Sequence, residues 1–133
     1  MNEGGDILNT AITILLIIVG IIHLLPLSGV LGAKRLKALY DLSFEEPNLE
    51  ILMRHRAVLF GLLGVFLIYA AFQSILQPLA FIAGFVSVLS YMGLARQVGG
   101  YNAALRKVYI ADVVALGCLI TAIFIYIVSG AKR

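Results

Sequence analysis

Four long runs of apolar residues constrain this chain more than any other feature of its sequence. They predict helices at about residues 7–25, 49–72, 79–97 and 103–129. A helix needs about 20 predominantly apolar residues to cross roughly 30 Å of hydrocarbon, and each run is near or above that length. None of the runs alternates with period two, as the strands of membrane barrels do. The sequence therefore predicts an all-α integral membrane protein.

The composition favours a bilayer rather than water as the solvent of this chain. Of its 133 residues, 62% are hydrophobic and 13% are charged, whereas about 25% of the residues of a soluble domain are charged. Too few polar residues remain to cover a water-soluble domain of this size. The length predicts a single domain over residues 1–133. The single cysteine, Cys118, excludes an intramolecular disulfide.

Local signals mark the expected helix ends. Asp6 is expected to cap the first helix and Pro26 to end it. Pro78 suits the first turn of the third helix, and Asn102 is a candidate N-cap for the fourth. The paired glycines at 99–100 supply the backbone freedom that a tight turn needs.

The connections between the helices differ in length. Residues 26–48 form the only long one, and within it Leu36, Leu39 and Tyr40 follow helical spacing. This spacing predicts a short helix in the membrane interface, with an irregular loop as the alternative. The other connections are short, so successive helices should be antiparallel. The predicted fold is an antiparallel bundle of four transmembrane helices, with a short interfacial helix between the first and the second.

Basic residues gather on one side of the predicted membrane spans. With four spans, both termini share a side, and of the ten lysines and arginines only Lys132 and Arg133 lie there. The positive-inside rule places the other basic residues in the cytoplasm. A bacterial inner (cytoplasmic) membrane location with both termini periplasmic follows. The residues on the basic side are Lys34, Arg35, Lys37, Arg54, Arg56, Arg96, Arg106 and Lys107.

Polar side chains from all four predicted spans are expected at one depth near the basic side. A carboxylate inside a span, such as Asp112, is costly and usually faces the bundle interior with a partner. Its own helix offers little, so the partner should come from another helix. Three interpretations stay open for Asp112: an interhelical ion pair, a role in ligand or proton handling, or solvent exposure. The candidate ligand-binding residues are His23, Arg54, His55, Arg56, Arg96 and Asp112.

The basic triplet at residues 54–56 cannot act as one patch. Successive helical residues lie about 100° apart, so at most two of the three can face inward. Arg54 lies one turn after Glu50, a favourable i,i+4 pair. At least one of the three should extend toward lipid phosphate. For His23, the alternative to a ligand contact is a buried imidazole bonded to a backbone carbonyl.

The charges favour an anionic or amphipathic ligand over a metal ion. His23, His55 and Asp112 do not pair at i,i+3 or i,i+4, so no metal site is expected. The planar fork of arginine matches phosphate, carboxylate or an acidic lipid head group. No serine elbow, P-loop or dinucleotide fingerprint occurs. Neither a catalytic residue nor a cofactor is predicted.

Small residues recur at helical spacing, which lets helix backbones approach closely. Examples are Ala57 with Gly61 and Ala111 with Ala115. Packing within one bundle explains this pattern, and a homodimer interface is the alternative.

The runs HLLPLSGVLG, LYDLSFEEPNLEILMRHRAVLFGLLG, GGYN and ADVVAL resemble a set of small bacterial four-helix inner-membrane proteins of unassigned function. These proteins are DoxX-like in broad fold, and the resemblance extends from residue 23 to about residue 116. Some such sequences bear the label phosphopantetheine adenylyltransferase, but that enzyme is a soluble nucleotide-binding α/β protein. The resemblance therefore implies a fold and a compartment, and no chemistry.

The leading hypothesis is a membrane protein that binds an amphipathic or anionic small molecule or lipid, or assists its transport, and so contributes to envelope homeostasis. One alternative is a small membrane enzyme, an isomerase or a redox helper, in which His23, His55 or Asp112 moves protons. Another is a structural or interaction subunit of a membrane complex, whose bundle should lack an internal cavity. Membrane lipids are the expected partners, and nucleic acid is not expected.

Overall fold

The computed structural model describes residues 3–131, and over that range the chain contains helices and no strand. This confirms the prediction of an all-α chain with apolar helices of membrane-spanning length. The segments long and apolar enough to cross a membrane are four: Glu3–Leu31, Pro47–Ala71, Ser74–Val98 and Ala103–Gly130. The chain is therefore a multi-pass membrane protein by the length and composition of its helices.

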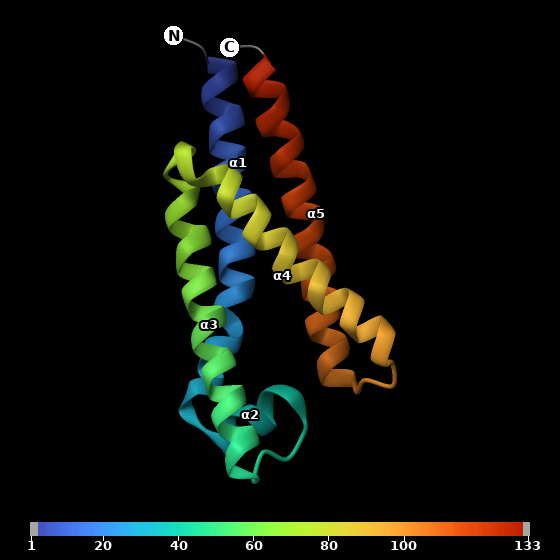
Figure 1. Cartoon of the computed structure of the whole chain (residues 1–133). Helices are drawn as coiled ribbons and strands as arrows, with labels where there is room; N and C mark the ends of the chain where they lie inside the picture. Colours follow the sequence, from blue (N-terminus) through green and yellow to red (C-terminus); the bar gives the residue numbers. More distant parts are fainter. Residues whose placement is uncertain (1–2, 132–133) are drawn as a thin grey trace.

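The long helices run between the two ends of an elongated molecule (Figure 1). Both termini lie at one end, and the short helix α2 lies at the opposite end (Figure 1). The connection at 26–48 thus contains a helix and is not wholly irregular. In chain order the elements are α1 (Glu3–Leu24), the 3-10 helix η1 (Leu25–Leu31), α2 (Ala33–Tyr40), α3 (Pro47–Ala71), the 3-10 helix η2 (Ser74–Leu76), α4 (Gln77–Val98) and α5 (Ala103–Ala131).

The expected helix-end signals hold with one exception. The Oδ1 atom of Asn102 accepts a hydrogen bond from the Leu105 N–H at 2.9 Å, which confirms it as the N-cap of α5. Pro78 lies in the first turn of α4, and α1 ends at Leu24, just before Pro26. Asp6 is not a cap, because α1 already includes Glu3. Both acids lie in its first turn, where the helix dipole favours negative charge.

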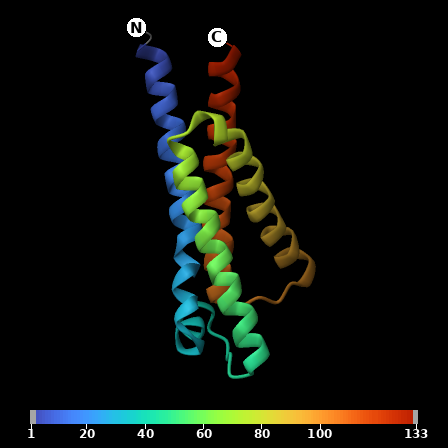
Figure 2. The ribbon, with the colours of Figure 1, turned by 60° about the vertical axis from the view of Figure 1, so that its left-hand side comes forward.

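Helix packing is uneven. α1 packs mainly against α3 and α5, and α4 packs mainly against α5. After η2, α4 runs obliquely away from α3 (Figures 1 and 2). The main core lies among α1, α3, α4 and α5, and a smaller cluster joins α2 to the connection that follows it. Fully enclosed members of the core are Leu16, Val19, Leu67, Ala70, Ala80, Val88, Ala115, Leu119 and Ala122, and the smaller cluster is Leu36, Tyr40 and Phe44.

Two glycines bring the backbones of α1 and α3 into direct contact. A Cβ atom on Gly64 would lie 2.8 Å from the Gly20 carbonyl oxygen, and one on Gly20 would lie 3.0 Å from the Gly64 carbonyl oxygen. Ala57 is also buried on α3, and a Cβ on Gly61 would meet Leu27 at 2.6 Å. These small residues therefore serve packing within one molecule, as close helix contacts in membranes require.

Gly64→Ala is expected to destabilise the protein by about 1–3 kcal/mol, because the added methyl group would meet backbone of α1. The check is the melting temperature of the purified protein in one detergent. Gly117→Ala is the matched control, since a Cβ there has nothing within 4 Å. That control should be neutral or stabilising, because alanine favours helix over glycine. Equal melting temperatures for the two variants would contradict the close contact of α1 and α3.

The start of α3 is held by an acidic cap. The Glu46 carboxylate accepts hydrogen bonds from the N–H groups of Asn48 and Leu49 at 3.1 and 2.8 Å. Pro47 follows in the first turn, where its missing N–H costs nothing. The two backbone hydrogen bonds hold the pKa of Glu46 below its ordinary value. The charged cap therefore stabilises the folded chain above the ordinary glutamate pKa, and this stabilisation is lost as the pH falls through the lowered pKa.

Glu46→Gln is expected to lower the melting temperature at pH 7, because the cap loses its charge. The difference from the unsubstituted protein should shrink as the pH falls well below roughly 4.3 and the carboxylate of the latter becomes protonated. Melting curves at pH 7 and in the acid range measure this. Glu45→Gln is the control, since Glu45 is exposed and accepts no hydrogen bond in the described chain. A difference independent of pH would show that the charge of Glu46 does not stabilise α3.

Candidate functional site

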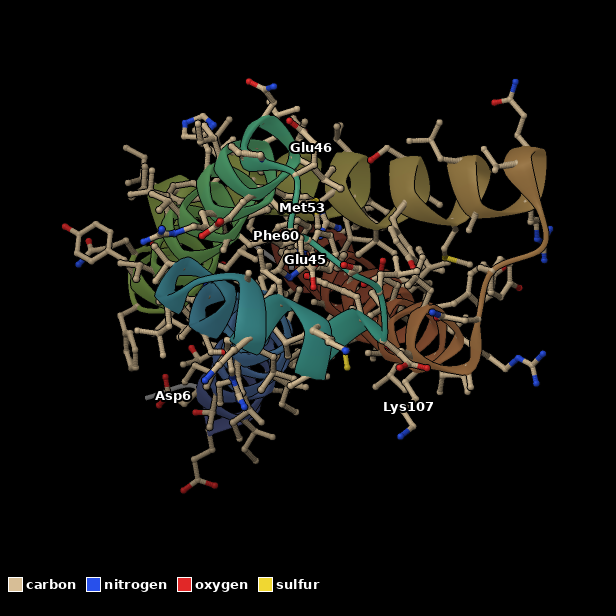
Figure 3. The ribbon with its side chains drawn as sticks, turned by 90° about the horizontal axis from the view of Figure 1, so that it is seen from below. Asp6, Glu45, Glu46, Met53, Phe60 and Lys107 are labelled. Atoms are coloured by element: carbon tan, nitrogen blue, oxygen red, sulfur yellow. The ribbon has the colours of Figure 1, made fainter. Side chains whose placement is uncertain are left out.

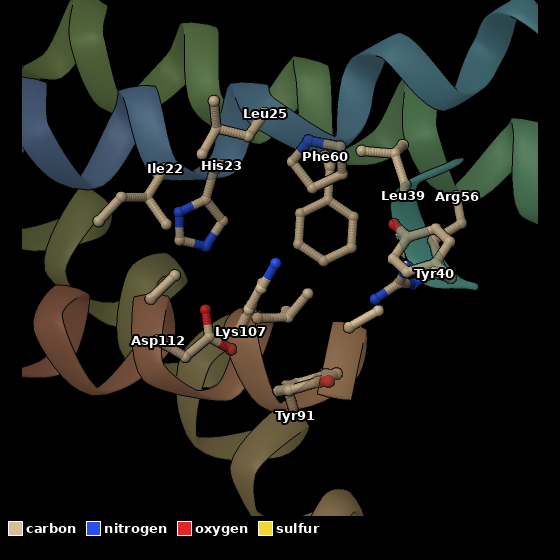
Figure 4. Close-up of a pocket in the computed structure, with 14 residues that line it drawn as sticks. Ile22, His23, Leu25, Leu39, Tyr40, Arg56, Phe60, Tyr91, Lys107 and Asp112 are labelled. Carbon is tan, nitrogen blue, oxygen red and sulfur yellow. Dashed lines mark hydrogen bonds between the residues drawn. The ribbon is translucent and has the colours of Figure 1, made fainter. Parts of the chain in front are cut away.

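A cavity of about 210 Å³ lies near the end of the molecule that carries α2 (Figure 4). Every α-helix contributes to its wall, and most of the side chains are apolar. Its polar residues are His23, Tyr40, Arg56, Tyr91, Lys107 and Asp112. A mostly apolar space with a few polar groups is typical of small-molecule sites. A purely structural subunit was expected to lack an internal cavity, so the presence of this one argues against that alternative.

His23 is a buried residue of α1 with both ring nitrogens in use. Its Nδ1–H donates to the Val19 carbonyl oxygen at 2.8 Å. In the neutral imidazole, Nε2 then accepts from the Ser87 hydroxyl of α4 at 2.9 Å. The ring also stacks on Phe60 of α3, with centroids 5.9 Å apart. His23 is therefore bonded to a backbone carbonyl, as the alternative interpretation predicted, and it also lines the cavity.

Arg56 is the one member of the 54–56 triplet that lines the cavity. Its Nη1 donates to the Tyr40 hydroxyl at 3.0 Å. Its guanidinium carbon lies 4.7 Å from the Phe60 ring centroid and 5.7 Å from that of Tyr40. Both distances suit a cation–π contact. Two aromatic rings and a hydroxyl therefore hold this cation in place at the wall.

Three predicted site residues lie elsewhere. Arg54 pairs with Glu50 at 3.3 Å, as predicted, and its Nε donates to the Val30 carbonyl oxygen at 2.9 Å. His55 is exposed and does not line the cavity. Arg96 is exposed, and its Nε donates to the Tyr109 hydroxyl at 2.8 Å. Because successive helical residues are rotated by about 100°, only Arg56 of the triplet faces Tyr40.

Asp112 lines the cavity from α5 and is only 9% exposed. Within residues 3–131, no cationic nitrogen lies within 4.0 Å of its carboxylate, and no hydrogen bond reaches it. The interhelical ion pair considered for this residue is therefore not formed. Figure 4 shows Asp112, His23 and Arg56 extending from α5, α1 and α3 around one space. A buried carboxylate without a partner is costly, which marks this residue as a candidate for function.

Some residues of the site were missed by the sequence analysis. Phe60 follows Arg56 by one turn, so the i,i+4 spacing was a usable signal. Tyr40 was assigned to the face of an interfacial helix. Tyr91 was missed as well, and its hydroxyl donates to the Leu105 carbonyl oxygen at 3.1 Å. The positions of these two tyrosines depend on how the long connection folds back and on how α4 tilts, which local sequence does not encode.

A second cavity of about 430 Å³ adjoins the first. Tyr40, Arg56 and Tyr91 line both cavities and so form their common wall. The remaining residues of the second cavity are Leu42, Ser43, Phe44, Leu49, Met53 and Leu105.

The site offers no metal-binding set in the part of the chain that the structure describes. No three histidine, cysteine, aspartate or glutamate side chains come together there. Cys118 is not among the residues that line the cavity. The chemistry that the site can provide is therefore that of one carboxylate, one guanidinium, one lysine amine, two phenols and one imidazole.

Ser87→Ala is expected to destabilise the protein by about 0.5–2 kcal/mol, because the buried His23 Nε2 would lose its partner. Ser90→Ala is the matched control on the same helix, since the exposed Ser90 hydroxyl donates only to the Ser87 carbonyl oxygen at 2.9 Å. The control should change stability little. Melting temperatures in one detergent test this, and an equal loss in both variants would contradict a buried His23–Ser87 bond.

Comparison with known proteins gives no assignment. No protein-family model matches the chain, and no curated protein or solved structure matches it. The function has to be argued from the site itself.

Proposed function

We propose that this chain lies in a bacterial inner (cytoplasmic) membrane, with its long helices crossing the bilayer as an antiparallel bundle. The position of both termini at one end, opposite α2, supports this (Figure 1). Eight of the ten lysines and arginines belong to the α2 side, so the positive-inside rule favours a cytoplasmic α2 and periplasmic termini.

In this orientation α2 lies in the cytoplasmic interface. Its basic residues Lys34, Arg35 and Lys37 are exposed, and Leu36 and Tyr40 are buried. Exposed basic side chains suit contact with lipid phosphates, and the buried apolar face fits the end of the bundle. Kinship with small DoxX-like four-helix membrane proteins is part of the same proposal and rests on the sequence runs quoted above.

The function that the site supports best is binding of an amphipathic small molecule or lipid, as a binding or transport-assisting protein of the envelope. The observation that carries it is the Asp112 carboxylate, which has no partner within residues 3–131 and faces a mostly apolar cavity beside Arg56. A polar group of the ligand would meet these two side chains, and its apolar part would lie along Ile22, Leu25 and Val108. A carboxylate buried without a partner costs several kcal/mol of solvation, and a bound polar group offsets that cost.

The positions of the two histidines favour a binding function over acid–base catalysis. Both nitrogens of His23 are bonded within the protein. His55 is exposed and does not line the cavity, so it has no direct route to Asp112. A proton relay through this pair lacks a connected path.

Filling the cavity is expected to abolish binding. Ala111 lines the cavity, and Ala111→Phe would place an aromatic ring in a space of about 210 Å³. Native mass spectrometry of the full chain, extracted from membranes in a mild detergent, is expected to show a retained small molecule or lipid. The Ala111→Phe variant should lose it.

Val114→Phe is the matched control on the same helix, because Val114 is exposed on the protein surface. This control should retain the bound molecule. The proposed function fails if both variants and the unsubstituted protein retain the same molecules, or if none of them retains any.

A further inference from the structure

The polar groups on the cavity wall differ in how far the protein itself satisfies them. Both nitrogens of His23 have partners, and the single hydroxyl proton of Tyr91 is donated to a backbone carbonyl. Arg56 donates one hydrogen bond to Tyr40. Within residues 3–131, Asp112 is the buried group of the wall that has neither a hydrogen bond nor a cation within 4.0 Å. Lys107 also makes no hydrogen bond there, but its side chain is exposed.

The Asp112 oxygens face the cavity. No fully enclosed side-chain oxygen or nitrogen of the described chain lacks a hydrogen-bond partner. Because the Asp112 oxygens do lack one, they keep some accessible surface, and Asp112 lines the cavity, with its carboxylate drawn toward that space in Figure 4. An ionised carboxylate only accepts hydrogen bonds. The missing partner is therefore a donor, and it has to come from the contents of the cavity.

The neighbouring cations do not fill this place. The Arg56 guanidinium is held by the Tyr40 hydroxyl and by the rings of Phe60 and Tyr40. Lys107 lines the cavity, and in Figure 4 its amine is drawn over the space between His23 and Phe60. The residue is exposed, however, and in the view from the α2 end its side chain extends outward from the helices (Figure 3). Neither cation forms a contact with Asp112 that meets the 4.0 Å limit.

Arg56 adds a second requirement. A guanidinium carries several N–H donors and no acceptor, and one donor of Arg56 is bonded to Tyr40. The others remain for an acceptor in either cavity that Arg56 lines. An anionic ligand alone would leave Asp112 unpaired, and a cationic ligand alone would leave Arg56 without an anionic partner, since its only acceptor in residues 3–131 is the neutral Tyr40 hydroxyl. Unpaired buried charges are the main penalty against a wrong ligand.

The size of the cavity limits what enters it. Its volume of about 210 Å³ corresponds to roughly seven water molecules at the density of the liquid. Sites for drug-sized molecules are usually about 300–1,000 Å³. The cavity therefore accommodates a compact head group, while a longer apolar part would extend along the helices.

We propose that the cavity binds a compact zwitterionic head group, whose primary ammonium donates to Asp112 and whose phosphate or carboxylate accepts from Arg56. This inference rests on the proposed binding function and specifies its ligand class. The head group can belong to a membrane phospholipid of the ethanolamine type or to a free amine-bearing phosphate. Both present the same charges at the same spacing.

The test compares head groups on the purified full chain. Native mass spectrometry titrations use phosphatidylethanolamine, phosphatidylcholine and phosphatidylglycerol with identical acyl chains, and soluble O-phosphoethanolamine. Phosphatidylethanolamine is expected to bind roughly 10-fold or more tightly than the other two lipids, because only it offers ammonium N–H donors to Asp112. Binding of O-phosphoethanolamine as well indicates that the head group suffices. Its failure to bind, with the lipid preference intact, assigns the site to the lipid.

Asp112→Asn keeps the shape of the side chain and removes its charge, and it should abolish the preference for phosphatidylethanolamine. Glu50→Gln is the matched control, since Glu50 pairs with Arg54 outside the cavity, and it should keep the preference. Lys107→Met tests whether the lysine serves as an internal counter-ion. If this variant loses as much thermal stability as Asp112→Asn and no lipid preference exists, Lys107 is the partner and the inference is overturned.

The outcomes separate this inference from the function on which it rests. If phosphatidylglycerol binds best and Ala111→Phe still abolishes its binding, the cavity binds ligands but the zwitterionic head group is wrong. If no lipid binding responds to Ala111→Phe, the binding function itself fails. The ranking of the lipids on the unsubstituted protein needs no variant, so the inference can be tested even where Asp112→Asn does not fold.

Discussion

The contact between Gly20 and Gly64 sets the geometry on which the candidate site depends. It brings the backbones of α1 and α3 close enough that a single methyl group on Gly64 would meet a carbonyl oxygen at 2.8 Å. His23 follows Gly20 by about one helical turn, and Phe60 precedes Gly64 by about one turn. The close approach therefore aligns the two rings, which stack 5.9 Å apart. Arg56 lies one further turn along α3, over the same Phe60 ring.

Sequence reasoning located part of this site because intramembrane ionisable residues are rare and costly. His23, Arg56 and Asp112 were found in this way, from their depth in the apolar runs. The same reasoning also selected Arg54, His55 and Arg96, which lie at a similar depth and bond elsewhere or remain exposed. Depth follows from position along a helix, but the direction of a side chain depends on the rotation of that helix. That rotation is set by contacts such as those of Tyr40 and Gly64, which come from residues distant in sequence.

The arrangement of the helices shows the same limit. Helix existence and approximate length were predictable from the apolar runs, since each run has the length that a bilayer demands. The oblique course of α4 was not predictable from the sequence. It depends on the 3-10 helix η2, which stands where a simple turn was expected, and on packing of α4 mainly against α5. As a result Tyr91 reaches the cavity wall, where it lines both cavities together with Tyr40 and Arg56.

Asn102 connects the end of α2 to the start of α5. Its Oδ1 caps α5, and its Nδ2 donates to the Tyr40 carbonyl oxygen at the end of α2 at 2.8 Å. The side-chain amide of Asn102 thus links the end of α2 to the first turn of α5 through two hydrogen bonds. A ligand that displaced Tyr40 would pull on the start of the helix that carries Asp112, so occupancy of the cavity and the order of the α2 end of the molecule would be coupled.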